Sequence, residues 1–160
     1  MEKSASQPIT STESSEIAGV QTFQVDAGHT PSKVDYPQMP PAGGLHNPAW
    51  QNCGIYDTPV DAENGVHSME HGATWIAYKP EVGAATIEKL RGLVRGKTYT
   101  LLSPMQEASA PIVAAAWGFR LELTDANDPR LPQFLSKYVN GPQTPEPGAT
   151  CSGAKGLPVE

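Results

Sequence analysis

A long proline-rich stretch, residues 31–66, constrains the fold of this chain more than any other feature. It shows little hydrophobic periodicity, so it indicates neither a regular helix nor a regular strand. Connections of this length without secondary structure are uncommon inside a compact domain, except where they carry a function or pack on a scaffold. We therefore expect this stretch to lie against a scaffold and to contribute to a functional site.

Periodic segments on both sides of this stretch predict the scaffold. Strands are predicted where apolar residues alternate or form short runs that end at proline, and helices where apolar residues recur at helical spacing. The predicted strands are 20–25, 74–78, 99–103 and one long strand over 111–123, and the predicted helices are 84–95 and 128–139.

This order of elements predicts an α+β fold, with a small mixed or mainly antiparallel sheet, two helices and the long proline-rich loop. With 160 residues, one domain is expected. Residues 1–18 are rich in serine and threonine, so we expect a disordered tether there, left after removal of a signal or lipoprotein anchor. Residues 19–160 form the globular domain in this interpretation, and its C-terminal tail is irregular.

Charge and hydropathy exclude two classes of partner. The net charge is -6 and Lys and Arg number 11 in total, which argues against nucleic-acid binding because phosphate contacts need clustered cations. The longest apolar run, 111–117, is far shorter than the 18 or so residues of a membrane span. We expect no transmembrane segment in this chain.

The two cysteines, Cys53 and Cys151, stand too far apart in sequence for a local chelating pair. They form either a long-range disulfide or two free thiols, and we favour the disulfide because both lie in turn-rich segments that it would join. A disulfide implies an oxidising compartment, so we expect a periplasmic or extracellular protein.

Histidines provide the strongest chemical signal, in the sequence His67-Ser-Met-Glu-His71. In a helical turn, His67 and His71 lie on one face and could bind one metal ion. In an extended segment, Met69 would join them instead. Imidazole with carboxylate suits zinc, whereas imidazole with methionine sulfur suits Cu(I).

Other donors lie in the predicted loops. His46 ends Pro40-Pro-Ala-Gly-Gly-Leu-His46 and Met105 follows a predicted strand, so both are candidate ligands beside His67 and His71. His29 is interpreted as a turn residue. The motif also matches the H-x-x-E-H pattern of zinc peptidases, with Glu70 activating water and Glu146 as third ligand, although Gly72 and a strand follow at once.

Five motifs in the same order resemble the bacterial family called domain of unknown function 3105. They span residues 34–153 and lie at 40–46, 52–57, 66–72, 116–118 and 145–151. The resemblance implies an exported or membrane-anchored protein and a shared pattern of His46, Cys53, His67, Glu70, His71, Trp117 and Cys151. Many members have leucine where this chain has Met69, and Thr-Ser where it has Ala42-Gly43.

We predict an exported metal-binding protein, and favour a copper carrier or chaperone that delivers Cu(I) to a client metalloprotein. Its site would use His46, His67 and His71, with Met105 or Met69 completing it. One alternative is a zinc or copper enzyme with Glu70 as general base. The other is an interaction module without metal, in which His67 is hydrogen-bonded on both nitrogens.

Overall fold

The computed structural model describes residues 17–160. The tether expected at residues 1–18 therefore lies outside the described residues except for its last two positions. Ile17 is only 8% exposed and packs against an apolar cluster of the core. Within the described part of the chain, no helix is long and apolar enough to cross a bilayer.

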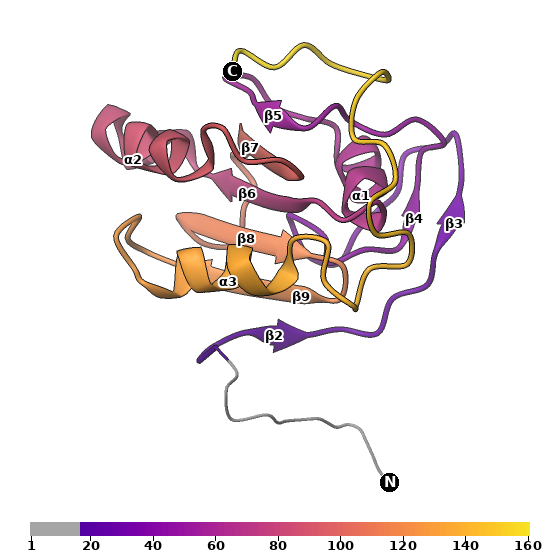
Figure 1. Cartoon of the computed structure of the whole chain (residues 1–160), viewed down its shortest axis with the longest axis horizontal. Helices are drawn as coiled ribbons and strands as arrows, with labels where there is room; N and C mark the ends of the chain where they lie inside the picture. The colour runs from indigo at the N-terminus through magenta and orange to yellow at the C-terminus, as the bar shows by residue number, and fades with distance from the viewer. Residues whose placement is uncertain (1–16) are drawn as a thin grey trace, which may run out of the picture.

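A six-stranded mixed sheet forms the centre of the molecule (Figure 1). Its strands, from one edge to the other, are β2 (Gln21–Thr22), β9 (Phe119–Leu123), β8 (Ile112–Ala116), β6 (Thr74–Tyr78), β7 (Thr100–Pro104) and β5 (Gly54–Ile55). The pairs β2–β9, β9–β8 and β8–β6 are antiparallel, whereas β6–β7 and β7–β5 are parallel. The α+β fold with a mixed sheet is thus confirmed.

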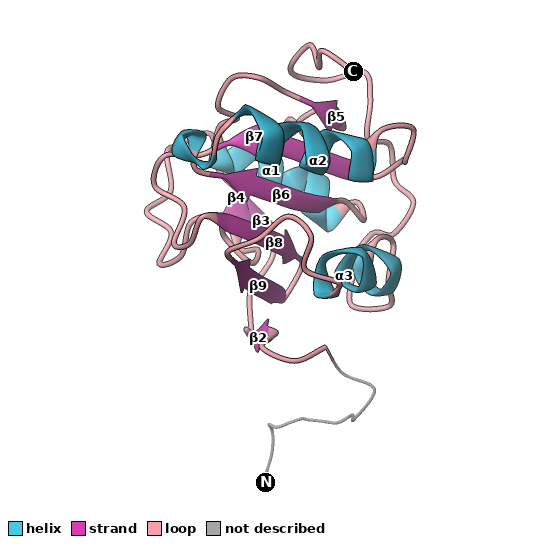
Figure 2. Ribbon diagram, turned by 90° about the vertical axis from the view of Figure 1, so that its left-hand side faces the viewer, coloured by secondary structure: helices cyan, strands magenta, loops and turns pink. Residues whose placement is uncertain are grey.

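Each face of the sheet is covered by a different layer. Side chains alternate along a strand, so Ile76 and Tyr78 of β6 enter one apolar cluster while Trp75 and Ala77 enter the other. The first cluster is closed by α2 (Ala84–Val94) and α3 (Arg130–Tyr138), and a short 3-10 helix, η1 (Pro80–Val82), precedes α2. The second is closed by α1 (Ala62–Glu70), which lies behind the sheet in Figure 2.

Three details of the predicted scaffold are wrong. The long strand expected over 111–123 is a hairpin, because Gly118 adopts a positive φ of 84° and reverses the chain, so that Ala116 pairs with Phe119. The strand expected over 20–25 is reduced to the two residues of β2. The described chain has three α-helices and not two, since α1 was left open as a helical or extended segment.

Helix α1 approaches the sheet closely because residue 65 is glycine. A Cβ atom on Gly65 would lie 2.4 Å from the ring of Trp75 on β6. Val66 and Met69 face the same apolar cluster, both almost completely buried. The apolar side of α1 is therefore fixed against the sheet, and its polar side faces away from it.

The proline-rich stretch covers this polar side with residues 31–61, as expected of a loop packed on a scaffold. Its last residues, 62–66, form the first half of α1, although the lack of periodicity predicted no helix there. The covering part contains β4 (Leu45–His46), which pairs in parallel with β3 (Gly28–His29) in a separate two-stranded sheet. The C-terminal tail returns to the same region, where the disulfide between Cys53 and Cys151 joins it to the loop, with Cα atoms 5.4 Å apart. The expected disulfide is thus confirmed in the structure.

Candidate metal site

Helix α1 has an unusual composition for a buried helix, because its polar residues are as buried as its apolar ones. His67, Glu70 and His71 are each at most 5% exposed. Residues 67 and 71 lie one helical turn apart, and their rings are in contact, with centroids 4.5 Å apart. The helical alternative for this motif is therefore correct and the extended alternative is wrong.

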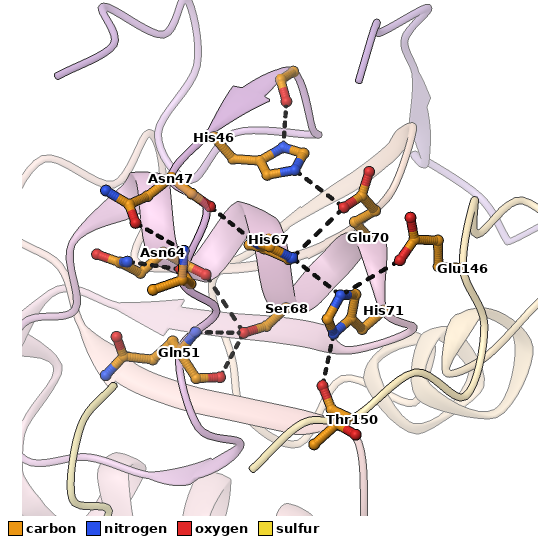
Figure 3. A network of polar contacts seen from close by, with 12 residues as sticks. His46, Asn47, Gln51, Asn64, His67, Ser68, Glu70, His71, Glu146 and Thr150 are labelled. Atoms are coloured by element: carbon orange, nitrogen blue, oxygen red, sulfur yellow. Dashed lines mark hydrogen bonds and ion pairs between the residues drawn. The ribbon is translucent and has the colours of Figure 1, made fainter. Parts of the chain in front are cut away.

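The loop and the helix are joined by hydrogen bonds that satisfy these buried polar groups. The Ser68 hydroxyl donates to the Gln51 carbonyl oxygen, and the side-chain amide of Asn64 donates to the carbonyl oxygen of Ala49. The backbone N–H of Asn47 donates to the carbonyl oxygen of Glu63. Figure 3 shows part of this network around His67. It holds the loop in one register along α1.

The small two-stranded sheet adds two more histidines to the site. His29 on β3 is the register partner of His46 on β4, so their side chains lie side by side. The ring of His46 is completely buried and lies 4.8 Å from that of His67, between centroids. His29 is exposed, and its ring stacks on His67 at 5.0 Å. All four histidines of the chain thus meet in one place.

Backbone carbonyls set the orientation of three of these rings. His46 Nδ1–H donates to Gly44 at 2.8 Å, His67 Nδ1–H to Asn47 at 2.7 Å, and His71 Nδ1–H to Thr150 at 2.6 Å. Each carbonyl can only accept a hydrogen bond, so each ring keeps its proton on Nδ1. The remaining nitrogen, Nε2, is then the atom with which each ring could bind a metal ion.

These Nε2 atoms meet one another and two carboxylates. His46 Nε2 lies 3.1 Å from Glu70 Oε1, and His67 Nε2 lies 3.8 Å from the same oxygen. His67 Nε2 also lies 3.0 Å from His71 Nε2, and His71 Nε2 lies 3.6 Å from Glu146 Oε1. Figure 3 shows His67 between His46 and His71, with Glu70 alongside.

The donor atoms form two groups that share one carboxylate. The inner group consists of His29, His46, His67 and Glu70, and the outer group of Glu70, His71 and Glu146; within each group the ligand atoms lie within 4.8 Å of one another. Glu146 is the most accessible of the three outer donors, with 58% of its side chain exposed. The second and third ligands of the H-x-x-E-H interpretation, His71 and Glu146, do therefore lie together.

The two predicted sulfur ligands lie elsewhere in the packing. Met69 and Met105 are 1% and 3% exposed and belong to the apolar cluster between α1 and the sheet. Met69 is two residues from both His67 and His71, so its side chain points about 160° away from theirs around the helix axis. The structure thus brings His46, His67 and His71 together, with His67 in the middle, and packs the methionines among apolar side chains.

Sequence reasoning missed His29 as a member of this cluster. Its position in Ala27-Gly-His-Thr30 resembles a turn, and a two-residue strand leaves no periodic signal. The partner that places it, His46, lies 17 residues further along the chain on another two-residue strand. The only available signal was its residue type. In a chain with four histidines and one predicted metal site, each histidine is a candidate ligand.

Burial and neighbouring imidazoles keep His67 neutral. Loss of solvent lowers the pKa of His67 most, and His71 and His46 lower it further, against the opposing effects of the Asn47 carbonyl and Glu70. A neutral ring has one Nε2 lone pair available. Since metal ligation requires the neutral ring, the surroundings of His67 favour ligation at pH 7.

Comparison with known proteins identifies a family but no characterised relative. A family model described as "Protein of unknown function (DUF3105)" matches residues 29–153. No curated protein and no solved structure matches the chain. The matched residues include the whole inner group and both cysteines.

Proposed function

We propose, for a chain that belongs to the DUF3105 family of proteins of unknown function, that it binds a divalent transition-metal ion at the inner group. The observation that supports this most is the orientation of the imidazoles. His46 and His67 of this group each use Nδ1–H on a backbone carbonyl and turn Nε2 toward the Glu70 carboxylate. Such second-sphere hydrogen bonds are typical of histidine ligands.

The contact between His67 and His71 supports a cation in particular. With both protons on Nδ1, two Nε2 lone pairs face each other at 3.0 Å, which is repulsive unless a cation or a proton lies near both. A proton shared between the two Nε2 atoms would correspond to the metal-free interaction module, in which His67 is hydrogen-bonded on both nitrogens. The lowered pKa of His67 disfavours that proton, so we favour the metal ion.

The donor types favour a divalent ion over Cu(I). Three imidazoles and one carboxylate are the ligands that Zn²⁺ and Cu²⁺ prefer, whereas Cu(I) prefers sulfur. Met69 and Met105 lie in the apolar cluster, so our expectation of a His/Met site for Cu(I) becomes a proposal of a His/Glu site for Zn²⁺ or Cu²⁺. Four donors around a tetrahedral ion lie about 3.3 Å apart for bonds of about 2.0 Å, and modest side-chain rotations bring the inner group to this spacing.

Exposure of part of the site supports a carrier. Exchange with a client protein needs a ligand that a partner can reach, and His29 is exposed while His46, His67 and Glu70 are buried. An enzyme would need Glu70 free as a base, but its carboxylate contacts His46 and belongs to both donor groups. We therefore propose a ligand role for Glu70 and a carrier role for the protein.

The compartment follows from the disulfide. We propose that the protein works in the periplasm or outside the cell, because a bridge between Cys53 and Cys151 persists where thiols are kept oxidised. Thiol labelling of protein taken directly from its host, with and without prior reduction, checks this. Labelling without reduction would contradict an oxidising compartment.

Competition titrations with a chromophoric chelator test the metal site, using the full chain without an affinity tag. We expect His46→Ala and His67→Ala each to lose at least tenfold in affinity for Zn²⁺ and Cu²⁺. Met69→Leu and Met105→Leu are matched controls that remove sulfur from the apolar cluster and should keep the affinity. Unchanged affinity in both histidine variants would reject the site.

A further inference from the structure

We infer that a second metal ion binds at the outer group, Glu70, His71 and Glu146, so that the Glu70 carboxylate bridges two ions. This inference rests on the proposed function, since it adds an ion beside the inner one. Glu70 is the residue that both donor groups share. A carboxylate has two oxygens and can bind one ion with each, which is how two-metal sites place their ions about 3.5–4 Å apart.

His67 and His71 place one ring nitrogen in each of the two donor groups. His67 belongs to the inner group and His71 to the outer one, and their Nε2 atoms lie 3.0 Å apart. His71 Nε2 lies 3.6 Å from Glu146 Oε1, on the side away from His46 in Figure 3. One nitrogen therefore faces each group of donors across a distance of a few ångströms.

The outer group is built by backbone contacts and is not a chance meeting of surface side chains. The Glu146 N–H donates to the Glu70 carbonyl oxygen at 3.0 Å, and the Gly148 N–H donates to that of His71 at 3.1 Å. The Thr150 carbonyl then accepts the proton of His71 Nδ1. These three hydrogen bonds fix the tail beside the C-terminal end of α1 and place Glu146 next to His71.

An aromatic side chain shields the outer group from one side. The Trp50 ring lies 5.2 Å from that of His71 and 5.7 Å from that of His67, between centroids, and its Nε1–H donates to the Ser152 carbonyl oxygen. The ring thus joins the proline-rich loop to the tail over the two imidazoles. With three protein donors and an exposed Glu146, the outer group leaves a coordination position to solvent, so we expect it to bind more weakly than the inner group.

Stoichiometric titration of the untagged full chain with Cu²⁺, followed by electron paramagnetic resonance, tests the inference. We expect two steps, and in the second step a broadened signal from two coupled ions. Glu146→Gln, an exposed and conservative change, should leave the first step unchanged and remove the second. His71→Ala should also remove the second step. Glu88→Gln is the matched control, because it removes a carboxylate from α2 on the opposite face of the sheet and should keep both steps.

The outcomes separate this inference from the proposed function. Saturation at one ion that depends on His46 and not on Glu146 would overturn the second site and keep the first. One ion that depends equally on His67 and His71 would also overturn the second site. If neither the unmodified chain nor any variant binds Cu²⁺, the proposed function itself is overturned.

Discussion

His71 donates a hydrogen bond from Nδ1 to the carbonyl oxygen of Thr150, the residue before a disulfide-bonded cysteine. The orientation of a candidate metal ligand therefore depends on a tail that a covalent bond holds in place. Cys53 strengthens this link, since its N–H donates to the carbonyl oxygen of Cys151 at 2.7 Å. The candidate metal site and the disulfide are thus one structural unit.

Loss of the disulfide should lower both stability and metal affinity. For Cys53→Ser/Cys151→Ser we expect a decrease of about 2–4 kcal/mol in the free energy of unfolding, because the bridge closes a loop of 98 residues. The affinity of the outer group should fall, since Thr150 and Glu146 are no longer held beside His71. Urea unfolding and Cu²⁺ titration of the double variant measure the two effects. An unchanged second titration step would contradict the link between bridge and site.

Close packing of α1 on the sheet should also be needed for metal binding. Gly65→Ala would place a Cβ atom 2.4 Å from Trp75, so α1 must shift, and we expect a destabilisation of about 1–3 kcal/mol and weaker metal binding. Gly92→Ala is the matched control in α2, where a Cβ meets nothing within 4 Å. It should be neutral or stabilise by up to about 1 kcal/mol. Thermal unfolding of both variants checks this, and equal stability of the two would be evidence against tight packing at Gly65.

The metal-free protein should lose stability in mildly acidic solution. The pKa of His67 is lowered in the folded state, so the unfolded chain binds the proton more readily. Stability should therefore be constant above pH 6.5, the ordinary value for histidine, and fall as pH drops from there toward the folded pKa. Chelator-treated protein unfolded by urea at pH 8, 7, 6 and 5 shows this slope. His67→Gln should show a shallower one, and a slope of opposite sign would mean that His67 is protonated in the folded protein.

Much of the scaffold is predictable because its signals are local. The short apolar runs that form β6 and β7 reflect burial on both faces of the sheet. The helical spacing that forms α2 and α3 reflects burial of one side of each helix. The hairpin at Gly118 was missed because the apolar residues of β8 and β9 read as one continuous run. A single glycine decides between a strand and a turn there, and its φ depends on the sheet that forms around it.

The candidate site is predictable only in part, because the loop that completes it has no periodic signal. The spacing of His67 and His71 marks the two residues as a pair in either a helix or an extended segment, and the structure decides for the helix. The meeting of His29 and His46 depends on pairing between two-residue strands, which only the folded chain defines. Nothing in the sequence indicates that polar residues of α1 such as Ser68 are buried, yet the loop buries them.

X-ray absorption at the metal edge of the Zn²⁺-loaded, untagged protein shows whether oriented imidazoles and Glu70 bind a divalent metal ion without sulfur. We expect nitrogen and oxygen neighbours at about 2.0 Å, with outer-shell scattering from several imidazoles. Sulfur at about 2.3 Å, or a spectrum of hydrated zinc alone, would contradict this expectation.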